Sequence, residues 1–179
     1  MEEVEKYEIE VEITSPILQH KFNGKDEEKA NKEKSDKEQA EYHAYRTENG
    51  NMGIPSTWIK GCLREYIVAH AGSKQKRSTL LEISPRIQVQ PYMIDLGTKV
   101  YKIDKRAIPV KIQGKISDMD FCIRPLIEKA KFTFVLVSTL SKTEDEWKSI
   151  IEGAGIDTGI GSNTVNGYGR FKVLSITKV

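Results

Sequence analysis

The chain of 179 residues has few of the residues on which several common chemistries depend. It contains two cysteines, Cys62 and Cys122, which lack the close spacing of a metal-binding or disulfide-rich module. We therefore expect both to be small buried apolar residues and expect no metal site. No apolar run is as long as a membrane span, and the acidic start Met1–Glu5 does not resemble a secretion signal. These absences predict a cytoplasmic protein without a membrane partner.

Glycine is concentrated near the end of the chain, but in the wrong order for a nucleotide cofactor. The segment 159–170 reads Gly159-Ile160-Gly161-Ser162-Asn163-Thr164-Val165-Asn166-Gly167-Tyr168-Gly169-Arg170. A dinucleotide fingerprint runs from strand through glycines to helix, whereas this segment follows a predicted helix and precedes a predicted strand. The sequence Gly-Lys-Ser/Thr of a phosphate-binding loop is also missing. We expect no cofactor, and a loop whose backbone N–H groups face phosphates of another kind.

Charge is unevenly distributed along the chain. Residues 1–59 hold 8 basic and 14 acidic side chains, whereas residues 60–130 hold 14 basic and 7 acidic ones. A basic middle region is typical of a protein with an anionic partner such as a nucleic acid. The alternative is that these lysines and arginines are an ordinary solvated surface.

The pattern of apolar residues predicts an α+β fold. Tyr7–Ile13 alternates apolar and acidic residues, which is typical of a strand with one buried face. Further strands are predicted over 87–93, 108–116, 131–137 and 171–176, and helices over 54–68 and 144–155, the second with a capping box at Thr143 and a stop at Gly155. Gly61 inside the first helix suggests close approach of another backbone. The order matches a ferredoxin-like (RRM-like) β-α-β-β-α-β core with hairpin extensions.

A highly charged stretch interrupts this pattern after the first strand. Residues 23–41 contain almost no apolar side chain and are not expected to contribute to a core. We predict one domain over 1–179, with residues 19–52 forming a charged insertion that projects as a mobile, partly helical arm.

Two motifs lie at the joints of the predicted elements. The first comprises Arg46, the turn Gly50–Gly53 and the run Ile54-Pro55-Ser56-Thr57-Trp58-Ile59-Lys60-Gly61-Cys62-Leu63-Arg64. The second is the glycine segment from Gly159 to Arg170, placed before the last strand. Both resemble motifs of the RAMP superfamily, in particular of the Cas7-like backbone subunits of CRISPR effector complexes. The order His20-Lys21-Phe22, Tyr45-Arg46, Gly50–Pro55 and Gly159–Phe171 also resembles small stand-alone RAMP-like proteins encoded by phages.

The resemblance implies that the helix after the Lys-Gly motif and the glycine segment face a nucleic-acid backbone. Such a ligand would be bound by cations near a helix start and by the N–H groups of the glycines. The Arg170 guanidinium would bind a phosphate group with two hydrogen bonds, and aromatic rings would stack on the bases. The predicted nucleic-acid-binding residues are Lys60, Arg64, Gly159, Gly161, Gly167, Tyr168, Gly169, Arg170, Lys111, Lys115, Arg46, Phe22 and Tyr45. Partners would be single-stranded RNA or DNA, together with further copies of the chain or the subunits of a Cas-type complex.

Several alternatives stay open at this stage. His20 follows the first strand, where a Cas6-type endoribonuclease could use a histidine as general acid or base, and Asp26 lies where other RAMP subunits carry a cleaving aspartate. Both candidates are single residues without a recognisable catalytic context, so a binding protein is favoured over an enzyme. A phage protein that binds single-stranded DNA during replication or recombination, and a scaffold that binds other proteins, would use the same fold.

Overall fold

A computed structural model describes residues 4–71, 81–112 and 115–179, and its core is a four-stranded antiparallel sheet. The strands β1 (Glu5–Ile13), β4 (Ile87–Gln90), β8 (Lys131–Ser138) and β9 (Phe171–Lys178) lie in the order β4-β8-β1-β9. With the helices α3 (Ser56–His70) and α5 (Glu144–Asp157), the order along the chain is β1-α3-β4-β8-α5-β9. This is the predicted ferredoxin-like arrangement, with β8 in a central position as its apolar sequence indicates.

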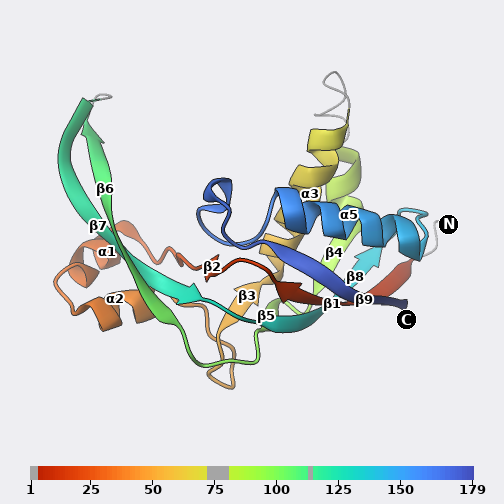
Figure 1. Ribbon diagram of the computed structural model, residues 1–179, viewed down its shortest axis with the longest axis horizontal. Helices are drawn as coiled ribbons and strands as arrows, with labels where there is room; N and C mark the ends of the chain where they lie inside the picture. Colours follow the sequence, from red (N-terminus) through yellow and green to blue (C-terminus); the bar gives the residue numbers. More distant parts are fainter. Residues whose placement is uncertain (1–3, 72–80, 113–114) are drawn as a thin grey trace.

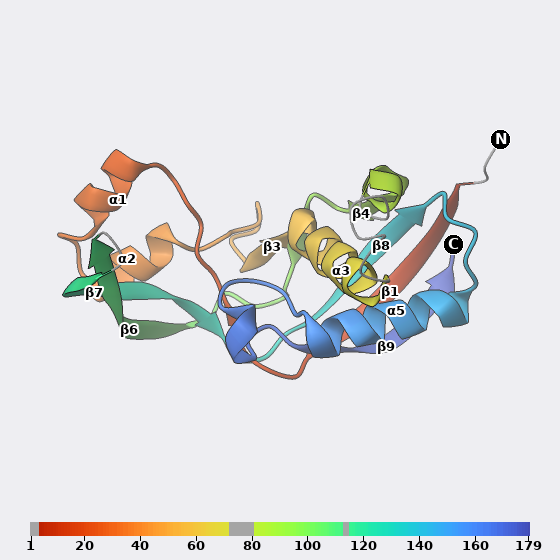
Figure 2. The same ribbon diagram turned by 90° about the horizontal axis from the view of Figure 1, so that it is seen from above.

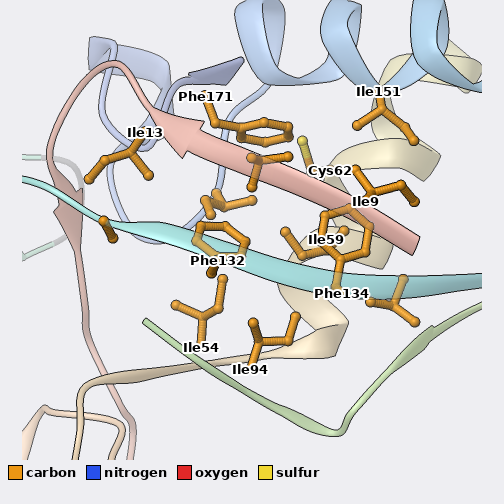
Figure 3. Packing of buried hydrophobic residues seen from close by; sticks show 14 of the residues in the cluster. Ile9, Ile13, Ile54, Ile59, Cys62, Ile94, Phe132, Phe134, Ile151 and Phe171 are labelled. Atoms are coloured by element: carbon orange, nitrogen blue, oxygen red, sulfur yellow. The ribbon is translucent and has the colours of Figure 1, made fainter. Parts of the chain in front are cut away.

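Both helices cover one face of the sheet (Figures 1 and 2). The buried side chains of β1 alternate along the strand, and Ile9 and Val11 are fully buried. Figure 3 shows Ile9, Phe132 and Phe134 of the sheet facing Ile59 of α3 and Ile151 of α5. This cluster positions the N-terminal turns of α3 and the loop that follows α5.

The opposite face of β1 is acidic. Because side chains alternate across a strand, Glu8, Glu10 and Glu12 lie on the face that the helices leave open. Glu12 is paired there with Lys172 at 2.8 Å and Lys131 at 3.7 Å. An acidic sheet face without aromatic residues on β1 is unsuited to the base stacking that RRM sheets perform.

A long hairpin extends from the core and carries the charged insertion. Strands β6 (Lys102–Ile112) and β7 (Lys115–Ile127) pair along their whole described length, and β2 (Ile17–Leu18) adds to β7. Helices α1 (Lys25–Asn31) and α2 (Asp36–Tyr42) lie beside this hairpin (Figure 1). We call the hairpin with α1 and α2 the arm.

Short elements complete the fold. Strand β3 (Gly53–Pro55) pairs with β5 (Met93–Asp95) immediately before α3. Single turns of 3-10 helix occur at η1 (Ser84–Arg86) and at η2 (Thr164–Asn166), the latter within the glycine segment. Within the described residues, no helix is long and apolar enough to cross a membrane.

Three sequence expectations about the fold are wrong. The predicted strand 108–116 is not one strand, since β6 ends at Ile112 and β7 begins at Lys115, and these two residues are antiparallel partners. Gly155 does not end its helix, because α5 continues to Asp157. Predicted strand 87–93 is divided between β4 and β5, which pair with different strands.

The close approach expected at Gly61 occurs elsewhere. A Cβ atom at Gly61 would have no neighbour within 4 Å, so this position on α3 is open. The tight glycines lie on α5: a Cβ at Gly153 would be 2.1 Å from the Tyr66 hydroxyl, and one at Gly155 would be 2.3 Å from the Phe171 carbonyl oxygen. Contact between α3, α5 and β9 therefore depends on Gly153 and Gly155.

Candidate nucleic-acid interface

The outer face of α3 carries two cations around an open glycine. Lys60 and Arg64 are four residues apart, hence neighbours on the helix surface, and both are half-exposed. Neither forms an ion pair with any residue that the structure describes. No side chain caps the helix N-terminus, where Pro55 is the capping residue. The two unpaired cations therefore lie side by side on α3, with Lys60 about one turn and Arg64 about two turns after the helix N-terminus.

The glycine loop, residues 159–170, lies against the start of α3. A Cβ at Gly161 would be 3.4 Å from the Trp58 ring and 2.7 Å from the Leu18 carbonyl oxygen. Gly161 has φ of 92°, so glycine is needed here both for the backbone conformation and for the contact. The loop and the first turn of α3, which are a hundred residues apart in sequence, thus form one surface.

Most donors of the loop are already used within the protein. The N–H groups of Gly159, Gly167 and Gly169 donate to the carbonyl oxygens of Ala154, Thr164 and Pro16 at 2.8–2.9 Å. Among the loop glycines only Gly161 has an N–H without an acceptor in the described part of the chain. The expectation that all these glycines offer free donors does not hold, and their observed role is to fold the loop back on β1 and β2.

Arg170 also has a structural role. Its Nη2 donates to the Thr164 carbonyl oxygen at 3.0 Å, and its own carbonyl oxygen accepts from Thr14 at 2.7 Å. The buried Nη1 has no hydrogen-bond partner among the described residues, and a Cβ at Gly159 would lie 2.7 Å from it. The guanidinium is therefore turned into the loop and is not presented as a fork to a phosphate group.

Tyr168 connects the loop to the arm. Its hydroxyl accepts a hydrogen bond from Arg106 of β6, and the Arg106 guanidinium carbon lies 4.7 Å from the centre of its ring. Asp104 in turn binds Arg106 at 2.7 Å and Arg124 at 3.3 Å. The sequence analysis missed this cluster, because only the hairpin pairing brings residues 104, 106 and 124 together.

Arg46, Tyr45 and Phe22 lie along the arm. Arg46 donates twice to the Glu41 carboxylate at 2.7 Å and once each to the Gly50 and Lys99 carbonyl oxygens. Tyr45 packs edge-on against Trp58 with 5.3 Å between ring centres. Phe22 is exposed and free to contact a ligand. Arg46 and Tyr45 thus fix the base of the arm in place beside α3.

Part of the basic middle region is paired with carboxylates where the structure describes it. Lys105 pairs with Asp36 of α2 at 2.9 Å, and Lys102 pairs with Glu128 at 2.9 Å. Asp120 of the same region pairs with Lys32 of α1. Hydrogen bonding from Lys32 lowers the pKa of the Asp120 carboxyl. Lys111 and Lys115 belong to β6 and β7, but their side chains lie outside the described residues. The unpaired cations of α3 are thereby distinguished from those of the arm.

The two catalytic candidates have different surroundings. Asp26 is exposed on α1 and has no hydrogen bond or ion pair within the described ranges. His20 is half-buried and stacks on His43 with 4.3 Å between ring centres, and Glu28 completes a group whose ligand atoms lie within 4.8 Å of one another. Burial and the neighbouring His43 lower the pKa of His20. The sequence analysis missed this three-residue cluster, because its members come from separate elements.

Comparison with known proteins finds similarity only at the level of structure. The sequence matches no protein-family model and no curated protein. A chain in the cryo-electron microscopy structure of the type III-B Cmr-β complex bound to cognate target RNA superposes with a TM-score of 0.60 at 15% identity, covering 98% of this chain and 61% of that chain. The fold is RAMP-like. Cmr6 from Pyrococcus furiosus matches with a TM-score of 0.50 at 11% identity over 96% of this chain and 98% of its own.

These similarities confirm the predicted fold and go no further by themselves. At such low identity they do not transfer ligands or functional residues from one chain to another. In this chain the glycine loop follows α5 and lies against the first turn of α3. The phage-encoded character suggested by the sequence remains a prediction.

Proposed function

We propose that the protein binds single-stranded RNA through its phosphate backbone on the surface formed by α3 and the glycine loop. The observation that carries this proposal is the contact of Gly161 with Trp58, which joins the loop to the first turn of α3, the helix whose outer face carries Lys60 and Arg64. Unpaired cations on an exposed helix face attract phosphate oxygens. The RNA-bound complex that contains a similar chain supports RNA as the ligand.

Gly61 adds a steric argument for this surface. It lies between Lys60 and Arg64 in sequence, and the space beyond its Cα is empty. Glycine in a helix interior costs about 1 kcal/mol relative to alanine, and no packing among the residues that the structure describes compensates for it. A nucleic-acid backbone that approaches α3 closely at this position would account for the residue.

Fluorescence anisotropy with a labelled single-stranded RNA tests the proposal. We expect Lys60→Gln and Arg64→Gln to weaken binding and each to reduce the slope of log affinity against log salt by about 0.7. Lys148→Gln, an equal change of charge at an exposed position on α5, is the matched control and should leave both quantities unchanged. Absence of RNA binding at low salt, or equal behaviour of all three variants, would refute it.

Gly61→Ala separates ligand contact from folding. In urea unfolding we expect the variant to be more stable by about 0.5–1 kcal/mol, because alanine is the better helix former. RNA affinity should nevertheless fall, since the added methyl group occupies the space proposed for the backbone. A variant that is stabilised and binds RNA as the wild type does would remove α3 from the interface.

We further propose that the protein acts as one subunit of a larger ribonucleoprotein. Ile103 and Ile108 on β6 and Phe121 on β7 are exposed apolar residues of the arm, which extends away from the core (Figure 2). Such residues suit contact with a neighbouring subunit. Light scattering after size-exclusion chromatography, with and without RNA, should show RNA-dependent assembly. Tighter binding of DNA than of RNA of the same sequence would instead favour the single-strand DNA-binding role.

A further inference from the structure

An aromatic residue, Tyr92, is exposed beside the start of α3. It connects β4 to β5 together with Pro91, and it is 74% exposed. Its hydroxyl group forms no hydrogen bond with any residue that the structure describes. The ring therefore contributes little to the packing of the core and is accessible to a ligand.

The backbone holds Tyr92 at a fixed position next to the helix. Strand β3 leads directly into α3 and pairs with β5, with Pro55 opposite Met93 (Figure 1). The pairing continues by one step, since the Ser56 N–H donates to the Tyr92 carbonyl oxygen at 2.8 Å. On its other side, Tyr92 is two residues from Gln90, where β4 of the core sheet ends. A residue held on both sides loses little backbone freedom when it binds a ligand.

Two further aromatic rings lie at the same end of α3. Trp58 belongs to the first turn of the helix, and Tyr45 packs edge-on against it with 5.3 Å between ring centres. Both residues are partly exposed. Burial, and after it the neighbouring phenol of Tyr92, raise the pKa of Tyr45, which places Tyr92 close to this pair. We call Tyr45, Trp58 and Tyr92 the aromatic platform.

The aromatic platform adjoins the cations and the open position of the proposed RNA surface. Gly61 is three residues after Trp58, so the empty space at Gly61 is next to Trp58 on the helix surface. Lys60 is four residues after Ser56, the residue whose N–H is bound by Tyr92, and therefore lies on that side of the helix. A nucleotide with its phosphate beside Lys60 and Gly61 would thus have its base at the platform.

Aromatic rings beside a cationic helix face fit a nucleotide of a single strand. Cations alone suffice to attract phosphate, whereas an aromatic ring adds a flat surface on which a base stacks whatever its identity. The faces of the bases are free in a single strand and covered by neighbouring base pairs in a duplex. Resting on the proposed RNA-binding function, we propose that the aromatic platform stacks on a base of the bound RNA, with Tyr92 as the main contact, and so selects single strands over duplexes.

Substitutions at Tyr92 test this proposal by fluorescence anisotropy with labelled single-stranded RNA. Tyr92→Leu keeps an apolar side chain and removes the ring, so affinity should fall by about 5–150-fold, the range for loss of one stacked base. The slope of log affinity against log salt should stay unchanged, because no charge is removed. Tyr92→Phe and Tyr92→Trp keep an aromatic ring and are the matched controls, which should bind as the wild type does.

Changes in the RNA test the same contact without relying on any variant. An oligomer of ribose phosphates without bases keeps the charge of the RNA, and it should bind the wild type more weakly than the RNA does. Tyr92→Leu should cause no further loss with this oligomer or with double-stranded RNA. Single-stranded RNA should also quench the fluorescence of Trp58, whereas the other tryptophan, Trp147, is fully buried in the core.

The outcomes distinguish this inference from the function on which it rests. If the wild type binds no RNA at low salt, both fail. If binding depends on Lys60 and Arg64 but is equally tight for Tyr92→Leu, or for the oligomer without bases, only the stacking inference is overturned. A loss with Tyr92→Phe as large as that with Tyr92→Leu would also overturn it, because the hydroxyl group rather than the ring would then be the contact.

Discussion

The glycines of the terminal loop differ in what occupies the space around them. A Cβ at Gly169 would lie 1.7 Å from the Ile160 carbonyl oxygen, whereas a Cβ at Gly167 would have no neighbour within 4 Å. Both residues have positive φ, at 69° and 86°. The sequence does not distinguish these two positions. In the structure, Gly169 has no room for a side chain, whereas Gly167 has room for one and needs glycine only for its positive φ.

Alanine substitution should separate these two glycines. Gly167→Ala is expected to lower the free energy of unfolding by about 1–2 kcal/mol, the cost of a left-handed backbone conformation. Gly169→Ala adds a clash with Ile160 and should cost more than this, or prevent folding of the loop. Urea unfolding followed by circular dichroism makes the comparison. Equal losses at the two positions would contradict the steric distinction.

At the scale of single elements, the helix α5 begins at a capping box that the sequence predicted. Thr143 Oγ1 accepts from the Glu146 N–H at 3.2 Å, and the Glu146 carboxylate accepts from the Thr143 N–H at 2.8 Å. These two reciprocal bonds satisfy donors that the helix itself leaves unpaired. Removing the side-chain acceptor with Thr143→Ala should lower stability by about 1 kcal/mol in thermal or urea unfolding. An unchanged free energy of unfolding would show that water replaces the cap.

The same box predicts a dependence on pH. Hydrogen bonds from the backbone and hydroxyl of Thr143, followed by the charge of Lys142, lower the pKa of Glu146 below its ordinary value of 4.5. Because the pKa of Glu146 is lower in the folded state, its carboxylate stabilises the fold fully when the pH is above the ordinary pKa. This stabilisation is lost as the pH falls through the lowered pKa of the folded state. The stability difference between wild type and Glu146→Gln should therefore shrink on acidification. A constant difference from neutral to acidic pH would contradict this contribution.

At the scale of the whole molecule, the core and the arm meet at the glycine loop. Figure 1 shows the loop between the two, where Tyr168 of the loop contacts Arg106 of the hairpin. The cation over the ring is worth about 0.5–2 kcal/mol depending on exposure. Through this side-chain contact, a ligand that binds α3 and the loop would also affect the arm.

Arg106→Ala should therefore uncouple the loop from the arm. We expect faster hydrogen exchange in residues 159–170 and 102–112, with β1 and β8 unchanged because their packing lies elsewhere. Tyr168→Phe keeps the ring under the guanidinium and loses only the hydroxyl, so its effect should be smaller. Exchange that is unaffected by Arg106→Ala would show that other contacts, such as that of Tyr45 with Trp58 and the pairing of β2 with β7, suffice to join the two parts.

Local patterns identified most of the core and the charged insertion over 19–52, but not the two long strands beside which its helices lie. β1, β8, α3, α5 and β9 each carry a periodicity or a cap within their own residues. Hairpin extensions were predicted, but the turn between β6 and β7 was not located, because Ile108, Ile112 and Ile116 keep the same even spacing on both strands and alternation alone does not mark the reversal. Of the candidate site, Lys60, Arg64 and the glycine loop were predicted from motifs, whereas the internal roles of Arg46 and Arg170 depend on partners such as Glu41 and Thr164.

The sequence by itself determined the α+β class, the order of the core elements and the positive character of α3, because these depend on neighbouring residues along the chain. The tertiary structure alone decided which cations are unpaired, which glycines are spatially required, and which distant side chains meet. Lys105 is paired and Lys60 is not, because folding of the arm brings Asp36 of α2 next to Lys105. His20, Glu28 and His43 form a cluster only because the folded insertion brings separate elements together, a long-range contact that no local spacing encodes.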